Sequence, residues 1–187
     1  MKFIQLGVLA LTLCFASGLK AQEIYLKFTG QNGNIISGES TAQGMKDNVQ
    51  GYSFAGSETS ACPSTGTGMG GCQTTTNNFF FVVKFDKALN TLRSAMYKGQ
   101  PLQNVEVTFR KTAAGTPFTY YTIRLETVQI VSISDAASTG GGDNTVQIEL
   151  KPGKFGYTYI TQTGTGAAGT PVKFGWDVIA NQEWTGF

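Results

Sequence analysis

The sequence predicts a mainly β fold with one short helix, arranged as a closed barrel or a sandwich. Apolar and polar residues alternate with a period of two over much of the chain, a pattern typical of strands with one buried face. One stretch, residues 85–96, instead repeats its apolar residues at helical spacing. Segments rich in Gly, Ser and Thr separate these stretches, so we expect short strands joined by loops.

Five stretches show the strand pattern most clearly. In the first, Ile24, Leu26 and Phe28 fall on one face, with polar or amphipathic residues between them. The same alternation occurs at residues 105–110, 121–126, 146–151 and 155–159. Residues 79–85 are apolar almost without interruption and rich in aromatics and valine, which predicts a strand buried on both faces.

The helical stretch is expected to pack through one apolar stripe. Asp86 or Asn90 can cap its start, and Gly99 can end it. The longest connection, about residues 56–78, is predicted to be a protruding loop, because such loops in compact domains are usually functional or disordered. The residues of the apolar stripe are Phe85, Leu89, Leu92 and Met96.

Residues 1–21 are predicted to be a secretory signal peptide that precedes a single mature domain, residues 22–187. Lys2 stands before an apolar run at residues 3–15, small residues follow, and Ala21 is the expected cleavage point. The run is too short to span a bilayer, and no later segment is apolar and long enough to do so. We therefore expect an exported protein, periplasmic or extracellular, without membrane insertion.

The predicted mature chain carries no formal net charge. The whole sequence has 14 Lys+Arg and 12 Asp+Glu, and Lys2 and Lys20 leave with the signal peptide, which leaves 12 of each sign. A neutral chain has no field that would steer it onto nucleic acid or an anionic membrane. No nucleic-acid partner is expected.

Cys62 and Cys72 are predicted to form a disulfide within the long loop. Export makes oxidation chemically reasonable, and a bridge of this kind would add roughly 2–3 kcal/mol by restricting the unfolded chain. A metal-binding pair is the alternative, but the chain has no histidine, and no third cysteine remains after cleavage. Neither a metal nor a cofactor is expected.

No motif requires an active site, and an enzyme is not expected. Nucleophile patterns of the Ser-x-x-Lys or Gly-x-Ser-x-Gly type do not occur. The segment at residues 66–71 resembles a phosphate-binding loop but lacks its Gly-Lys-Ser/Thr ending. Glu106, Glu126 and Glu149 lie on the polar faces of separate predicted strands, where two of them could meet as glycosidase acids. Solvated strand faces, or salt bridges between subunits, are the ordinary explanation for these carboxylates.

Short motifs follow one another in a distinctive order along the mature chain. The most specific is Lys84-Phe85-Asp86-Lys87-Ala88, which stands directly before the predicted helix. In this order the sequence resembles the Hcp family, the tube protein of type VI secretion systems, from about Ile24 to Asp177. The other motifs are Ile24-Tyr25-Leu26-Lys27-Phe28, Gly38-Glu39-Ser40, Tyr52-Ser53-Phe54, Gly153-Lys154-Phe155-Gly156-Tyr157 and Gly175-Trp176-Asp177.

The resemblance implies a tight antiparallel β-barrel flanked by one short helix, assembled into hexameric rings. Family rings stack into a hollow tube that a contractile sheath expels, so the implied partners are further copies of the chain, effectors in the lumen, and spike or sheath proteins. The long loop matches the family's extended loop, which reaches the neighbouring ring, and its ring-stacking residues would be Gly66, Gly68, Met69 and Gly70. Family members without an added toxin domain are not enzymes.

Two features depart from the family. Its typical members have no signal peptide, because they polymerise in the cytoplasm inside a sheath, and the Cys62 and Cys72 pair is not a family feature. The alternative function is therefore an exported binding module or an extracellular structural filament independent of a sheath. A binding module would recognise a glycan or surface through Trp184, Tyr120 and the loop around Met69. A monomeric barrel that shares the pattern is a further alternative.

Overall fold

The computed structural model describes residues 22–187, except 63, 66–67, 70–72, 114–115, 138–142 and 165–166. The predicted signal peptide, residues 1–21, lies outside the described residues. Helix α2 spans Ala88–Tyr97, and the strands are β1 (Gln22–Thr29), β2 (Ile35–Ile36), β3 (Val49–Ala55), β4 (Glu58–Ala61), β5 (Ser64–Thr65), β6 (Gly68–Met69), β7 (Gln73–Thr76), β8 (Phe79–Lys84), β9 (Leu102–Ala113), β10 (Thr116–Ala136), β11 (Thr145–Gln162), β12 (Ala168–Asp177) and β13 (Gln182–Glu183).

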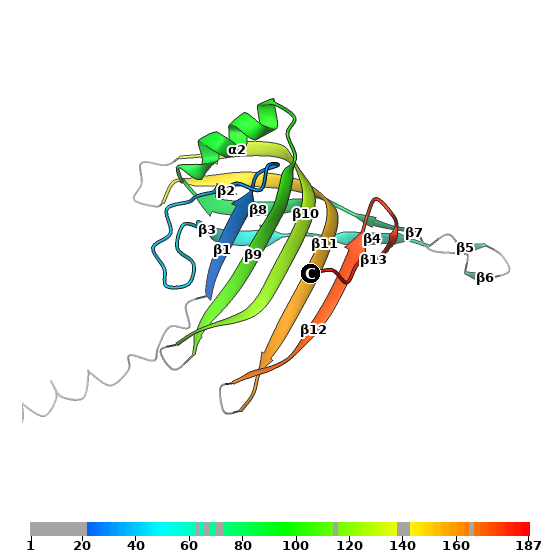
Figure 1. Ribbon diagram of the computed structural model, residues 1–187. Coiled ribbons are helices and arrows are strands. Elements are labelled where there is room, and N and C mark those ends of the chain that lie inside the picture. The colour runs from blue at the N-terminus through cyan, green and yellow to red at the C-terminus, as the bar shows by residue number, and fades with distance from the viewer. Residues whose placement is uncertain are drawn as a thin grey trace, which may run out of the picture.

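Six of the strands close into an antiparallel barrel (Figure 1). They are hydrogen-bonded in the order β10, β9, β1, β3, β8 and β11, and β11 pairs with β10 to complete the ring. Beyond β11 the sheet continues into β12 and β13, outside the barrel. The prediction of a mainly β fold, a tight antiparallel barrel with one short helix, is confirmed.

The barrel core consists of the apolar residues that alternate along these strands. Removing each such side chain from water stabilises the fold by about 1.5–3 kcal/mol. The sequence placed these residues correctly on β1, β9, β10 and the first part of β11. Fully buried side chains include Leu26, Phe28, Val49, Phe81, Val105, Val107, Ile123, Leu125, Val146, Ile148 and Leu150.

Strand β8 is buried on one face rather than on both. Phe79, Phe81 and Val83 are buried, whereas Phe80 and Val82 are only half-buried. The prediction of a doubly buried strand was wrong, because β8 belongs to the wall of an antiparallel barrel, with one face toward the core and one toward the surface.

Helix α2 covers one end of the barrel (Figure 1) and packs through Leu89 and Leu92, which are buried. Met96 lies partly buried against the core. Phe85 precedes the helix and is 38% exposed, so the apolar stripe is shorter than predicted. Gly99 adopts φ 62° after the last turn, and its N–H donates to the Met96 carbonyl at 3.0 Å, as a glycine that ends a helix does.

The long strands β10 and β11 curve strongly around the barrel (Figure 1). Gly153 belongs to β11. A Cβ at this position would be 3.2 Å from the Thr127 Cβ and 2.8 Å from the Ile179 Cδ1. Thr127 itself has φ 52°, a left-handed backbone conformation that is uncommon for threonine. The motif glycine therefore allows two chain segments to approach β11 closely.

Candidate assembly surfaces

A two-stranded arm projects from the barrel between β3 and β8 (Figure 1). Strand β4 pairs with β7 from Glu58↔Thr76 to Ala61↔Gln73, and further along the arm β5 pairs with β6. The segment predicted as a loop is thus largely a β-ribbon. Threonines are frequent in β4 and β7, and this β-branched residue favours strands. The glycine-rich composition of the loop concealed that signal.

The sequence-predicted residues of the arm are only partly described. Cys62 is disulfide-bonded, but Cys72 lies outside the described residues, so the pairing of these two cysteines stays a prediction. Of the four predicted ring-stacking residues, Gly68–Met69 forms strand β6. Gly66 and Gly70 lie outside the described residues.

The base of the arm is tied to the sheet by a hydrogen bond between Tyr157 on β11 and Glu58 on β4. The Tyr157 hydroxyl donates to Glu58 Oε1 at 2.7 Å. Burial, followed by the Glu58 carboxylate, raises the pKa of Tyr157 far above its ordinary value, so the hydroxyl keeps its proton and remains a donor. On the arm itself, the Asn77 amide donates to the Ser57 Oγ at 2.8 Å.

A second contact at the arm base centres on Glu149 of β11. Its Oε1 accepts from the Asn78 amide at 2.7 Å, and its Oε2 accepts from the Ser132 hydroxyl at 2.9 Å. Asn78 directly precedes β8, and Ser132 lies at a register shift in β10. Glu149 thus joins the end of the arm to two barrel strands.

The motif before α2 connects the helix to the loop that precedes β3. Asp86 Oδ1 accepts from the Ala88 N–H at 2.8 Å, and its Oδ2 accepts from the Glu39 N–H at 2.8 Å. In return, Glu39 Oε1 accepts from the Lys87 N–H at 3.2 Å. Asp86, rather than Asn90, therefore satisfies an N–H group at the helix start.

Lys84, the remaining residue of this motif, points to the segment before β11. Its Nζ lies 3.5 Å from Asp143 Oδ1. The Tyr52 hydroxyl also donates to this carboxylate. The hydrogen bond from Tyr52, followed by the charge of Lys84, lowers the pKa of Asp143 below its ordinary value.

The Gly153–Lys154 and Trp176–Asp177 motif residues meet beside the turn between β12 and β13. Asp177 Oδ1 accepts from the N–H groups of Ile179 and Ala180 at 3.0 and 2.9 Å, and the Lys154 Nζ lies 3.2 Å from its Oδ2. The backbone hydrogen bond from Ala180 and the interaction with Lys154 lower the pKa of Asp177. Trp176 is partly buried and packs against the core.

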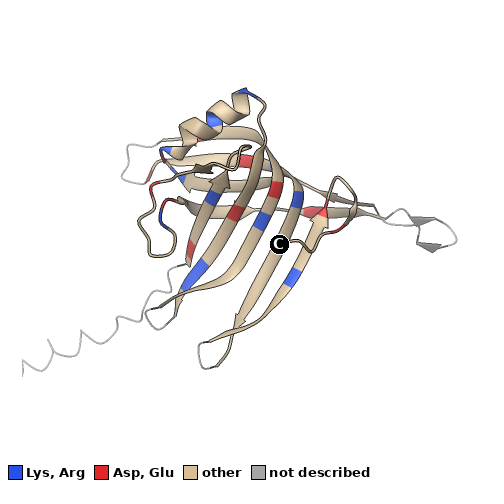
Figure 2. Cartoon of the chain, viewed as in Figure 1, with Lys and Arg blue, Asp and Glu red and all other residues tan. Residues whose placement is uncertain are grey.

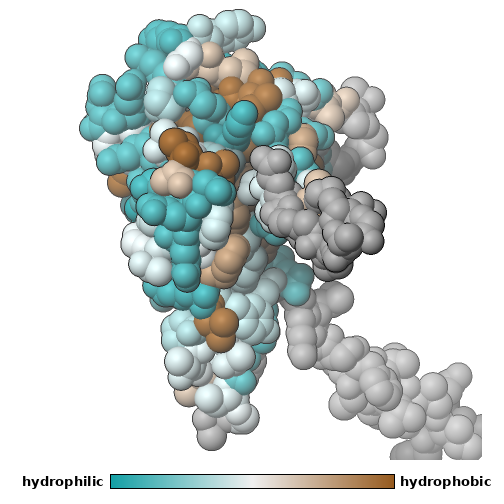
Figure 3. Space-filling view, turned by 90° about the vertical axis from the view of Figure 1, so that its right-hand side faces the viewer, coloured by the Kyte–Doolittle hydropathy of each residue, from teal (hydrophilic) through white to brown (hydrophobic). Residues whose placement is uncertain are grey.

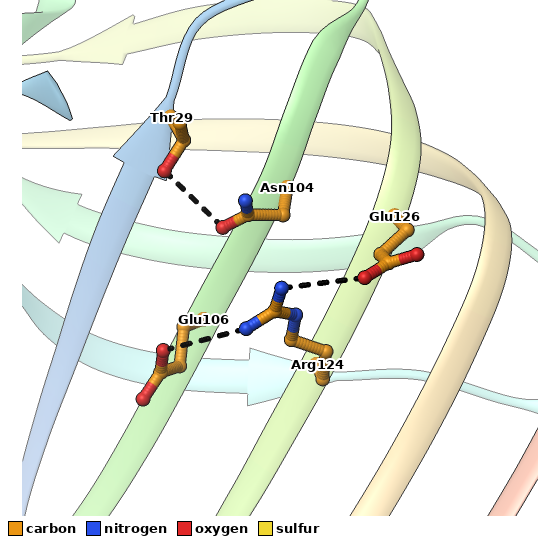
Figure 4. Close-up of polar contacts among 5 residues, drawn as sticks. All are labelled: Thr29, Asn104, Glu106, Arg124 and Glu126. Atoms are coloured by element: carbon orange, nitrogen blue, oxygen red, sulfur yellow. Dashed lines mark hydrogen bonds and ion pairs between the residues drawn. The ribbon is translucent and has the colours of Figure 1, made fainter. Parts of the chain in front are cut away.

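The outer face of the sheet carries charges of both signs across neighbouring strands (Figure 2). Arg124 on β10 lies between two carboxylates (Figure 4), at 4.0 Å from Glu106 and 3.3 Å from Glu126. Farther along the same face, the Thr29 hydroxyl on β1 donates to the Asn104 side-chain oxygen on β9 at 3.2 Å. The structure thus brings two of the three predicted carboxylates to the same arginine, and both form ion pairs with it.

The core-facing side of the sheet continues past the barrel and becomes exposed. Tyr159 is 47% exposed, Val172 66% and Phe174 52%. The predicted alternation in β11 is present, but burial decreases beyond Phe155 because the strand leaves the barrel. Tyr157 stacks on Phe174, with ring centroids 6.5 Å apart. On the side of the molecule from which the arm projects, apolar patches are separated by hydrophilic surface (Figure 3).

Strand β12 also has an open edge. Among the described residues, it pairs with β13 only at Trp176↔Glu183 and Asp177↔Gln182. Toward its start, β12 has β11 on one side and no described strand on the other. An exposed edge with apolar side chains is a surface that other strands can join.

A cavity of about 420 Å³ lies between the base of the arm and the sheet. Threonines of β7 line one side of it, and aromatic rings of β11 and β12 line the other. Its lining residues are Glu58, Thr74, Thr75, Thr76, Lys151, Phe155, Phe174, Trp176, Val178 and Asn181.

The residues suggested for glycan recognition have different neighbours. Trp184 packs on Phe187, with ring centroids 4.8 Å apart. Tyr120 on β10 lies beside Lys111, whose Nζ is 5.7 Å from the ring centroid. Within the described ranges, no group of three or more Cys, Asp or Glu could hold a metal ion. The same part of the chain contains no helix long and apolar enough to cross a membrane.

A sequence model of one family, described as "Type VI secretion system effector, Hcp", matches residues 25–163. The chain belongs to the Hcp family. This membership assigns it to the tube proteins of type VI secretion and confirms the resemblance drawn from the motif order. A comparison with curated protein sequences finds no match.

Solved Hcp structures share the fold. A type six secretion system protein superposes with a TM-score of 0.75 at 24% identity, covering 88% of this chain and 100% of that one. Hcp1 from Salmonella typhimurium gives a TM-score of 0.71 at 21% identity, covering 88% and 99%. A mutant Hcp1 from the E. coli EAEC 042 pathovar gives 0.67 at 20%, covering 82% and 97%.

Two sets of contacts were missed from the sequence. Arg124 stands two residues before Glu126 on the polar face of a predicted strand, so the alternation itself could have indicated their ion pair. Tyr157 and Glu58 are 99 positions apart, and no periodic pattern connects them. Their contact depends on how the arm leaves the barrel.

Proposed function

We propose that the mature protein is a non-enzymatic subunit that forms hexameric rings, and that these rings stack into a hollow tube as in type VI secretion. The proposal rests mainly on the exposed apolar surface of β12, in the part of the sheet that extends beyond the barrel. Val172 and Phe174 are exposed on its face, and no strand in the described part of the chain pairs with the outer edge of β12 near its start. Burying such a surface is favourable by roughly 25 cal/mol for each Å² of apolar area.

A ring of identical subunits needs two different complementary surfaces on each copy, so that rotation closes the assembly. We assign the exposed apolar face and edge of β12 as one of them. The outer face with Glu106, Arg124 and Glu126 suits an aqueous channel, because these charged side chains are partly exposed to water and Arg124 contacts both carboxylates within the subunit. The arm supplies the contact between stacked rings.

We further propose that residues 1–21 direct export and are removed. An extracellular filament that works without a sheath is the second candidate function. One observation favours it: Cys62 is disulfide-bonded, and disulfides persist in oxidising compartments outside the cytoplasm.

The full chain should be expressed, purified from the exported fraction and examined by negative-stain microscopy. We expect rings, and stacked rings at higher protein concentration. Monomers at every concentration, with and without reductant, would contradict the assembly proposal. Mass spectrometry of the same sample should show that residues 1–21 are missing, and an intact N-terminus would contradict export by a cleaved signal. Assembly in the absence of any sheath protein would support the filament.

A further inference from the structure

The arm is not held in place by close packing against the sheet beneath it. The cavity of about 420 Å³ separates the threonines of β7 from the rings of Phe155, Phe174 and Trp176. Phe155 is buried, Trp176 is partly buried, and Phe174 is 52% exposed. The arm continues the pairing of β3 with β8, so further contacts at its base must decide how close it lies to these rings.

The Tyr157–Glu58 hydrogen bond spans this region. The Tyr157 ring is fixed by neighbouring rings, with centroid distances of 5.4 Å to Phe155, 5.9 Å to Tyr121 and 6.5 Å to Phe174. Its hydroxyl therefore has a defined position. Glu58 is the first residue of β4, so the hydrogen bond of 2.7 Å acts where the arm begins.

The other contacts at the base restrain the arm differently. The hydrogen bond between Asn77 and Ser57 joins the two sides of the arm to each other, not to the barrel. The contacts of Glu149 hold Asn78, which lies outside the paired strands of the arm. Of the contacts described, only the one from Tyr157 links a paired strand of the arm to the sheet that lines the cavity.

We propose that Tyr157 and Glu58 are positioning residues that tie the base of the arm to the sheet and so fix the direction in which the arm reaches a neighbouring ring. Without this hydrogen bond, the base of the arm moves off the sheet, its direction is no longer fixed, and Trp176 becomes more accessible to water. The consequence for stacking rests on the proposed function. The position of the arm can be tested in a single subunit.

Trp176 is a natural reporter of this movement, because it lines the cavity and the chain has only one other tryptophan, Trp184. In a Trp184→Phe background, Tyr157→Phe should shift the Trp176 emission to longer wavelength and increase its quenching by acrylamide. Tyr159→Phe is the matched control, because it removes a hydroxyl from the same face of β11, two residues further along. The control should leave emission and quenching unchanged.

Glu58→Ala should give the same spectral change as Tyr157→Phe. The double variant should show no further change, because both substitutions remove the same hydrogen bond. Under negative stain, the single variants should form rings but lose stacks. Unchanged Trp176 quenching in Tyr157→Phe, or an equal change in Tyr159→Phe, would overturn the proposal. If the unsubstituted protein forms no rings, the proposed function fails, while the fluorescence still decides the role of Tyr157.

Discussion

The Lys154 ammonium lies 3.2 Å from the Asp177 carboxylate, and this ion pair joins two motif residues on the neighbouring strands β11 and β12. The other oxygen of the carboxylate accepts from Ile179 and Ala180, so one side chain fixes both the strand pair and the turn that follows it. Asp177 therefore holds the end of β12 in place beside the barrel.

Replacing Asp177 by Ala should lower the Tm at pH 7, because the turn loses its acceptor and Lys154 loses its partner. The pKa of Asp177 is lowered below 3.8 in the folded protein. Its stabilising effect is therefore fully present at pH values well above the unfolded-state pKa and is lost as the pH falls through the folded-state pKa. Thermal unfolding between pH 7 and pH 2 should show the difference between wild type and variant shrinking at low pH. A difference in Tm that is constant with pH would contradict the role of the charge. Asp177→Asn should lower the Tm less than Asp177→Ala does, because the amide oxygen can still accept from the turn.

Gly38→Ala should destabilise the fold by about 1–3 kcal/mol, because it forces atoms into a closely packed backbone. A Cβ there would overlap the Asn48 carbonyl and lie 2.8 Å from the Val49 nitrogen. Gly164→Ala is the control, since a Cβ at that position meets nothing within 4 Å. Urea unfolding should separate the two variants, and equal free energies of unfolding would show that the loop before β3 adapts.

Phe174→Glu should abolish ring formation while leaving the barrel folded, because a charge would replace an exposed aromatic side chain on the proposed contact face. Phe174 is 52% exposed in the subunit, so its substitution leaves no large internal cavity. Size-exclusion chromatography with light scattering should give a monomer for Phe174→Glu and the wild-type assembly for Phe174→Tyr. Rings formed by Phe174→Glu would place the subunit contact elsewhere.

Replacing Cys62 and Cys72 by Ser should weaken stacking more than folding. A bridge over a loop of this size contributes roughly 2–3 kcal/mol to the free energy of unfolding, and the barrel core lies outside the arm. Circular dichroism should remain that of a folded β protein, and electron micrographs should show shorter stacks. Treatment of the wild type with reductant should have the same effect. If the double variant instead lost the circular dichroism spectrum of a folded protein, the disulfide would be needed for folding of the barrel itself.

The sequence predicted β1, β9, β10 and the first part of β11 well, because these strands alternate between core and solvent. On β9, for example, Val105 and Val107 face the core, with Glu106 between them on the other face. The order of the motifs indicated the correct family. No motif by itself, however, indicates which residues its side chains contact. The structure was needed to show that β8 has one exposed face and that Asp86 holds both the helix and Glu39. The Tyr157–Glu58 contact could not be predicted from the sequence. Local periodicity says nothing about two residues 99 positions apart, which meet only because of the path that the arm takes from the barrel.

The open edge of β12 has a consequence for symmetry. Within the described part of the chain, the barrel strands use their hydrogen-bonding groups on one another, whereas the start of β12 presents a row of donors and acceptors outward. An incoming strand can pair with this row in the parallel or the antiparallel direction. Where the row meets a different surface of the next copy, as a closed ring requires, the assembly acquires a polarity: every copy points the same way.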